Sequence, residues 1–148
     1  MGRVLALDIG ERRIGVAVSD AFGVLAQPLA VLSRQSVAKD VAQLAQLIRE
    51  QEAQTVVVGL PVTLRGEQTQ AAQQVQAFVA RLREAVTVPV VFVDERLSTA
   101  EAERRLLEAD LRRAERRQKV DAVAAALILE RYLRQRESGT DGLAERTP

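Results

Sequence analysis

The sequence predicts an α/β fold with one five-stranded mixed sheet and helices on both faces. Three apolar segments with short links open the chain, which predicts an antiparallel meander of strands 1–3. Two further apolar segments then alternate with amphipathic stretches long enough for crossover helices, which predicts parallel strands 4 and 5. The length of 148 residues fits one domain, expected at 1–137, followed by a polar and flexible C-terminal tail at 138–148.

The first three strands follow from short apolar runs separated by turn residues. Residues Val4–Leu7 are uniformly apolar, and Asp8 follows directly, so the strand is expected to end there. The second strand is predicted at 13–19 and the third at 24–32. Because Pro28 offers no N–H to a sheet ladder, the third strand should lie at an edge or carry a bulge.

The next elements follow from a change of hydrophobic period. A helix is predicted from Ser36 to about Glu52 and a second from about Glu67 to Ala85, on either side of a strand at 55–58. The fifth strand is predicted at 88–93. The inward positions are expected to be Val37, Val41, Leu44, Leu47 and Ile48 in the first helix, with Lys39 and Asp40 on the polar side, and Ala71, Val75, Phe78, Val79 and Leu82 in the second.

The sequence predicts helices in the last third of the chain. Ser98-Thr99-Ala100-Glu101 fits a capping box, which predicts the start of a third helix. This helix carries the densest positive stretch, between Arg104 and Lys119. The alanine-rich segment 120–133 follows as a helix expected to pack closely on the sheet.

The composition of the chain limits the kinds of catalytic and metal sites it can form. The chain has no cysteine and no histidine, so thiolate nucleophiles, Ser-His pairs and most zinc sites are excluded. Carboxylates with hard, oxygen-bound cations such as Mg²⁺ or Mn²⁺ remain. No apolar run approaches the roughly 20 residues that span a bilayer, so we expect no membrane contact and a cytoplasmic location. A net charge of +1 and four aromatic residues favour recognition of nucleic-acid backbone and shape over base stacking.

Three acids are unexpected at their positions: Asp8 ends the first strand, Glu95 ends the fifth, and Asp121 lies in an otherwise apolar helix. Ligands gather beyond the carboxyl ends of strands in open α/β sheets, so Asp8 and Glu95 could share a mouth that the last helix closes. Converging carboxylates repel one another unless cations lie between them. Two divalent ions held by Asp8, Glu95 and Asp121 would support water attack on phosphorus, which needs neither histidine nor cysteine.

Each acid also has a simpler interpretation. Asp8 could form a turn beside Gly10, and Glu95 could pair with Arg96 at the surface. Asp121 could be a favourable charge in the first turn of a helix. Asp94 competes with Glu95, although strand alternation points the two side chains to opposite sides.

The basic residues admit two interpretations as well. The stretch up to Lys119 could be a solvated helix face with alternating ion pairs, or a clamp on phosphates. Loops near the predicted mouth supply further candidates. The residues predicted to bind nucleic acid are Arg12, Arg13, Arg65, Arg96, Arg112, Arg113, Arg116, Arg117 and Lys119.

Four linked motifs resemble the YqgF/RuvX family. They are Asp8-Ile9-Gly10 with Arg13-Ile14-Gly15-Val16-Ala17-Val18-Ser19-Asp20, Val58-Gly59-Leu60-Pro61, Asp94-Glu95-Arg96-Leu97-Ser98-Thr99, and Lys119-Val120-Asp121 with Ala124-Ala125. The resemblance covers about residues 3–133. It implies a ribonuclease-H-like fold and a cytoplasmic, divalent-metal-dependent endonuclease of pre-16S rRNA or of Holliday junctions, with its acids at Asp8, Glu95 and Asp121.

The sequence departs from the better-known bacterial junction resolvases that resemble this fold. In those proteins a catalytic acid ends the fourth strand, whereas Val58-Gly59-Leu60-Pro61 supplies none here. Glu95, after the fifth strand, must therefore substitute for it. The metal geometry is expected to differ accordingly.

Three classes of function stay open at the level of sequence. The leading hypothesis is a nuclease acting on the 5′ end of precursor 16S rRNA, with Holliday junctions as the alternative substrate. The second class is an ATP-binding domain of the actin and sugar-kinase type, whose phosphate-binding opening Asp8-Ile9-Gly10 also resembles. The third is a non-catalytic RNA-binding module that keeps the fold without turnover. Two symmetric cuts on a junction would require a homodimer, whereas trimming one RNA strand needs only a monomer.

Overall fold

The computed structural model describes residues 2–62, 69–94 and 113–137, and the side chains of the last segment from 121 to 136. The strands are β1 (Arg3–Ile9), β2 (Arg13–Ser19), β3 (Ala26–Ser33), β4 (Ala53–Leu60) and β5 (Val90–Asp94). The helices are α1 (Val37–Glu50), α2 (Gln70–Ala85) and α4 (Arg113–Glu137). Among these helices none is long and apolar enough to cross a membrane.

The five strands form one sheet in the order β3-β2-β1-β4-β5. The pairs β1–β2 and β2–β3 are antiparallel, and the pairs β1–β4 and β4–β5 are parallel, which confirms the predicted mixed sheet. β3 is an edge strand, and its register with β2 shifts where Pro28 pairs with Ala17. The proline therefore has both predicted consequences, an edge position and a bulge.

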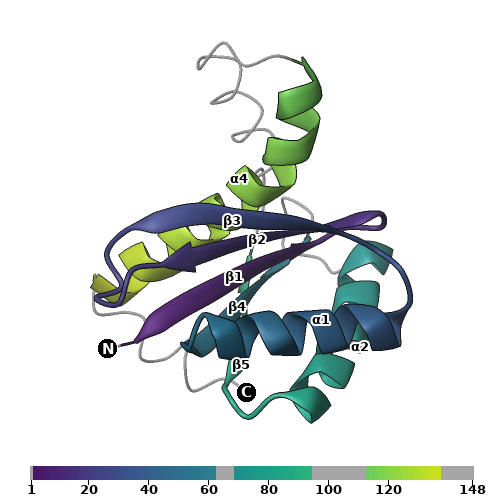
Figure 1. Ribbon diagram of the computed structural model, residues 1–148, viewed down its shortest axis with the longest axis horizontal. Coiled ribbons are helices and arrows are strands. Elements are labelled where there is room, and N and C mark those ends of the chain that lie inside the picture. The colour runs from purple at the N-terminus through teal and green to yellow at the C-terminus, as the bar shows by residue number, and fades with distance from the viewer. Residues whose placement is uncertain (1, 63–68, 95–112, 138–148) are drawn as a thin grey trace.

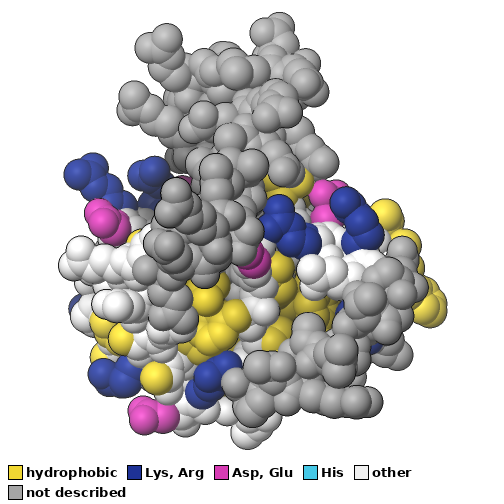
Figure 2. All heavy atoms as spheres, turned by 180° about the vertical axis from the view of Figure 1, so that it is seen from behind, with side chains coloured by type: hydrophobic (Ala, Val, Ile, Leu, Met, Phe, Trp, Pro, Cys, Tyr) yellow, Lys and Arg dark blue, Asp and Glu magenta, His cyan; other side chains and the backbone are white. Residues whose placement is uncertain are grey.

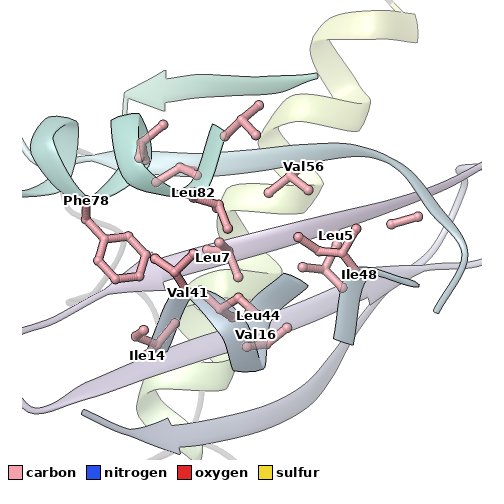
Figure 3. Packing of buried hydrophobic residues seen from close by; sticks show 14 of the residues in the cluster. Leu5, Leu7, Ile14, Val16, Val41, Leu44, Ile48, Val56, Phe78 and Leu82 are labelled. Carbon is pink, nitrogen blue, oxygen red and sulfur yellow. The ribbon is translucent and has the colours of Figure 1, made fainter. Parts of the chain in front are cut away.

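Helices cover both faces of the sheet, as predicted (Figure 1). On one face α1 and α2 pack against alternate strand residues such as Leu5, Leu7 and Val56, and Figure 3 shows this core. On the other face α4 crosses the sheet and packs its alanine-rich segment against the intervening residues, including Val4, Ala6 and Val57. The period-2 alternation of each strand therefore decides which layer a side chain enters.

Several predicted boundaries are wrong by a few residues. β1 does not end at Asp8 but continues to Ile9, because Ile9 still pairs with Ile14 in the ladder with β2. β4 extends over residues 53–60, and β5 covers 90–94 instead of 88–93. The first helix ends at Glu50 because Glu52, with a positive φ of 56°, leaves the helical conformation.

The second helix differs from its prediction in its first residue and in one of its inward-facing positions. Thr69 caps it, accepting a hydrogen bond from the N–H of Ala72, so the helix starts at Gln70. Ala72 is fully buried and Ala71 is exposed, which reverses the predicted assignment. The other inward positions of this helix are buried as predicted. In α1, Val37 is exposed although it was predicted to face inward.

Asp40 lies in the core side of α1, contrary to the polar position predicted for it. Its side chain is only 3% exposed and pairs with Arg34, whose Nε donates to Asp40 Oδ2 at 2.8 Å. The backbone N–H of Gln35 donates to the other carboxylate oxygen at 3.0 Å. Arg34 also donates to the carbonyl of Gly10 at 2.8 Å and lies over the Phe78 ring. The buried carboxylate thus fixes the link between β3 and α1 against the turn after β1.

The basic stretch and the last helix are partly one element. α4 begins at Arg113, so residues 113–119 continue without a break into the alanine-rich segment predicted from residue 120. The first turns of α4 extend beyond the sheet (Figure 1). The capping box at 98–101, the third helix predicted from it and the tail at 138–148 lie outside the described residues.

Candidate active site at the contact between β1, β2 and α4

Asp8 lies on the α4 face of the sheet. Its neighbours Leu7 and Ile9 belong to the core under α1 and α2, so Asp8 points to the opposite face together with Val4 and Ala6. In the ladder Asp8 is paired with Gly15 of β2. Directly opposite residues of an antiparallel pair share a face, so the missing side chain of Gly15 leaves space beside Asp8.

Gly15 brings the α4 backbone into contact with the sheet. A Cβ atom added to this glycine would stand 1.9 Å from the carbonyl oxygen of Asp121 and 2.3 Å from its carbonyl carbon. Only a residue without a side chain permits this approach. Asp121 is therefore held next to the strand residue that pairs with Asp8, although 113 positions separate the two acids in the chain.

An arginine of β2 orients the Asp121 carboxylate. Arg13 lies two residues before Gly15, on the same face of β2, and its Nε donates to Asp121 Oδ2 at 2.6 Å. The Asp121 side chain is 23% exposed and that of Arg13 is 46% exposed, so the pair sits at a solvent-accessible edge of the α4 contact. Asp121 thus presents a charge-paired carboxylate that solvent can reach.

α4 also reaches the end of β5. The Nη1 group of Arg131 donates to the backbone carbonyl of Asp94, the last residue of that strand. The strand order places β1 and β4 between β2 and β5. Asp8 on β1 is therefore flanked by the Asp121 contact on one side and by the end of β5 on the other, where Glu95 follows in the sequence.

The structure thus brings two of the three predicted acids, Asp8 and Asp121, to one face. Glu95 lies outside the described residues, and among the described residues no cluster of three potential metal ligands occurs. Asp94 is exposed, and alternation with Val91 and Val93 puts it on the face away from α4.

The simpler interpretations of Asp8 and Asp121 are both wrong. Asp8 lies inside the β1 ladder and is not a turn residue. Asp121 follows the start of α4 by eight residues, which is more than two helical turns and too far for a favourable first-turn charge. The interpretation of Glu95 as a partner of Arg96 is untested, because both residues lie outside the described part.

The basic residues predicted to bind nucleic acid also lie partly inside and partly outside the described part of the chain. Arg12 and Arg13 are exposed at the start of β2, and Arg13 is engaged by Asp121. Backbone positions are described for Arg113, Arg116, Arg117 and Lys119, all in α4, whereas Arg65, Arg96 and Arg112 lie outside the described residues. Figure 2 shows basic side chains at several separate places on the α4 side of the molecule, with acidic side chains among them.

Two residues of the candidate site have roles that the sequence does not predict. The sequence predicts Arg13 as a phosphate contact, whereas the structure pairs it with Asp121, and no prediction gives Gly15 a role. A glycine in the middle of an apolar strand is a known sign of close backbone approach, so Gly15 carried a readable signal. The partner of Arg13, 108 positions away, left no local pattern.

The donor set fits a hard divalent cation. Asp8 and Asp121 offer carboxylate oxygens, the ligand type that Mg²⁺ and Mn²⁺ prefer, and the chain contains no histidine or cysteine that would favour zinc. The guanidinium of Arg13 already places a positive charge against Asp121. The Asp121 carboxylate therefore already has one cationic partner.

Comparison with known sequences identifies one family over nearly the whole chain. Residues 2–135 match the family model of RuvX, described as a Holliday junction resolvase. A protein of Desulforudis audaxviator is 49% identical over 137 residues, covering 93% of this chain and 97% of its own. A protein of Thermoanaerobacter pseudethanolicus is 44% identical over 132 residues, covering 88% and 95%. Both carry the name "Putative pre-16S rRNA nuclease".

Solved structures with the same fold include junction resolvases. RuvC of Thermus thermophilus in complex with a Holliday junction substrate superimposes with a TM-score of 0.60 at 18% identity, covering 95% of this chain and 98% of its own. The resolvase of fowlpox virus in complex with Holliday junction DNA gives a TM-score of 0.55 at 10% identity, covering 90% and 97%. The ribonuclease-H-like fold predicted for this chain is thereby confirmed.

Proposed function

The chain belongs to the RuvX family, and on that premise we propose that it is an endonuclease that hydrolyses phosphodiester bonds in structured nucleic acid. We propose precursor 16S rRNA as its substrate, cut at the 5′ end, because relatives that are 44–49% identical over most of the chain are named as pre-16S rRNA nucleases. The observation that carries the proposal is the meeting of Asp8 and Asp121 on one face through Gly15.

Asp8, Asp121 and Glu95 would together hold Mg²⁺ or Mn²⁺. Val91 and Val93 of β5 belong to the α4 face, and the same alternation continued by one more step would bring Glu95 to the face of Asp8. A bound divalent cation supplies activation of the attacking water and stabilisation of the leaving oxygen in phosphodiester hydrolysis. In this proposal the carboxylates would come from Asp8 in β1, Asp121 in α4, and Glu95, which follows β5 in the sequence.

The rigid parts of the fold fix this arrangement. Asp8 is held by its pairing with Gly15 of β2, and it directly follows Leu7, which pairs with Val58 of β4 on the other side of β1. Asp121 is held by the contact of its own backbone with Gly15 and by Arg13. Placing acids on regular elements instead of loops limits their movement, and misplacement of about 1 Å costs as much as 10²-fold in rate.

The first turns of α4 are the proposed nucleic-acid-binding element. Arg113, Arg116 and Arg117 are spaced as positions on one helix face, and this part of α4 extends beyond the sheet (Figure 1). Contacts from such a helix to phosphates would add affinity without reading sequence. Such binding should weaken steeply as salt concentration rises.

A four-way DNA junction is the second candidate substrate, favoured by the description of the matching family model as a Holliday junction resolvase. This alternative requires a homodimer, because two strands must be cut symmetrically. A monomer in solution would favour the RNA substrate.

The test is a cleavage assay that offers a precursor 16S rRNA fragment and a four-way junction side by side, with Mg²⁺ or Mn²⁺. The expected result is cut RNA in the presence of either cation, no cleavage with EDTA, and none by Asp8→Asn. Cleavage of the junction but not of the RNA would indicate that the four-way junction is the substrate. Binding without cleavage under any metal would indicate a non-catalytic binding module and contradict the proposal.

A further inference from the structure

Arg13 lies between two features of the α4 edge. On one side its Nε donates to Asp121 Oδ2 at 2.6 Å. On the other side it lines a hollow of about 600 Å³ between the edge strand β3 and α4. Among the described residues that line it, Arg13 is the one charged residue, and the others come from β3 (Pro28, Leu29, Ala30, Val31 and Ser33) and from α4 (Ala122 and Val123).

The ion pair competes with a cation at Asp121. A carboxylate oxygen that accepts a charged hydrogen bond at 2.6 Å cannot present the same lone pair to a divalent ion. The positive guanidinium would also repel a cation bound beside it. Because the Arg13 side chain is 46% exposed, it can leave Asp121 without opening the core. Among the described residues that line the hollow, none carries a carboxylate that would compete with Asp121 for Arg13.

We propose that Arg13 is a positioning residue that holds Asp121 until the divalent cation binds, and then turns to a phosphate of the nucleic acid at the hollow between β3 and α4. This inference rests on the proposed function and deepens it by naming a substrate-binding position. The hollow is large enough for a nucleoside unit, and its small apolar side chains suit contact with a sugar or base edge.

Such an exchange couples the two ligands. Cation binding releases the arginine that the phosphate then takes, so each ligand favours the other. If the Arg13–Asp121 pair were purely structural, its removal would loosen Asp121 and weaken cation binding. Metal affinity would then fall instead of rise. The direction of the change in metal affinity therefore separates the two roles.

The first arm of the experiment is titration calorimetry of Mn²⁺, without nucleic acid, into the wild type, Arg13→Gln, Arg13→Lys and Arg12→Gln. Arg13→Gln is expected to bind Mn²⁺ about two- to fivefold more tightly than the wild type, the range set by an exposed ion pair. Arg12→Gln is the matched control, since it removes the same charge one residue away without touching Asp121. Arg13→Lys should stay close to the wild type.

The second arm is the kinetics of nucleic-acid cleavage. Arg13→Gln should raise KM about tenfold, as for the loss of one charged hydrogen bond to a phosphate, and leave kcat within about threefold. Arg13→Lys should restore part of the loss in KM, because it keeps the charge.

An Mn²⁺ affinity of Arg13→Gln that is equal to or weaker than that of the wild type would overturn the exchange, and so would an equal gain in Arg12→Gln. If the wild type binds Mn²⁺ but cleaves no nucleic acid, the proposed function fails while the calorimetry still decides the role of Arg13. If the wild type binds no Mn²⁺, both proposals fail.

Discussion

Gly15→Ala tests how closely the active site depends on one missing side chain. A Cβ atom at this position would lie 1.9 Å from the carbonyl oxygen of Asp121, and ordinary van der Waals contact begins at 3.4 Å. α4 must therefore move outward by about 1.5 Å, because its backbone carbonyl cannot rotate away as a flexible side chain could. Overpacking of this kind costs about 1–3 kcal/mol, and a clash with helix backbone should lie near 3 kcal/mol.

Both stability and activity should respond. For a chain of this length, about 3 kcal/mol lowers Tm by roughly 6–12 °C in a thermal unfolding experiment. Displacing Asp121 by about 1.5 Å should lower kcat by at least about 100-fold at temperatures where the variant is still folded. Gly2→Ala is the matched control, since the added Cβ would meet only the flexible end of Gln54. A Gly15→Ala variant with the Tm and kcat of the wild type would refute the close contact between β2 and α4.

Two further predictions concern acids outside the site. Asp40→Ala should lower the free energy of urea unfolding by about 2–3 kcal/mol because it leaves Arg34 without its carboxylate, and Asp40→Asn should cost less; an unchanged unfolding midpoint in Asp40→Ala would contradict the buried pair. The backbone N–H groups of Leu25 and Val24 lower the pKa of Asp20 below its ordinary value of 3.8. Asp20 therefore stabilises the fold fully above the pKa of the unfolded chain, and this contribution is lost as pH falls through the lowered pKa. Urea unfolding from pH 7 to pH 3 should show the advantage of the wild type over Asp20→Asn shrinking at the acid end, and an advantage that grows there would contradict the assignment.

The directions of the strands followed from the sequence because they depend on local patterns, whereas the place of β4 beside β1 was not predicted. Short links predicted antiparallel neighbours, intervening helices predicted parallel ones, and Pro28 marked the edge. Element ends were less accurate, because they depend on partners in the ladder. Ile9 extends β1 only because Ile14 pairs with it across the turn.

Side-chain environments were predictable only where hydrophobicity distinguished neighbours. Ala71 and Ala72 are equally apolar, so the pattern could not decide which of them faces the core. Asp40 is buried because Arg34 and a backbone N–H neutralise it, and neither partner is visible in a helical period. Local polarity is thus a weak guide to burial when a charged partner comes from the preceding turn.

The candidate site illustrates the same division. Asp8 and Asp121 were recognisable as acids in apolar surroundings, and the structure brings them to one face. The contact of Gly15 with the backbone of Asp121 and the ion pair of Arg13 with Asp121, 108 positions apart, arise from tertiary packing and have no local sequence pattern. The placement of Glu95 beside them remains a prediction.

The central claim is that Asp8, Glu95 and Asp121 act as one catalytic unit. The most direct measurement is the single-turnover cleavage rate in Mn²⁺ of Asp8→Asn, Glu95→Gln and Asp121→Asn, each checked for folding by circular dichroism. Loss of one carboxylate from a shared cation site removes several kcal/mol of transition-state stabilisation, so each folded variant should be slower by at least about 10³-fold. A folded variant of any of the three that cleaves within about tenfold of the wild-type rate would contradict the shared site.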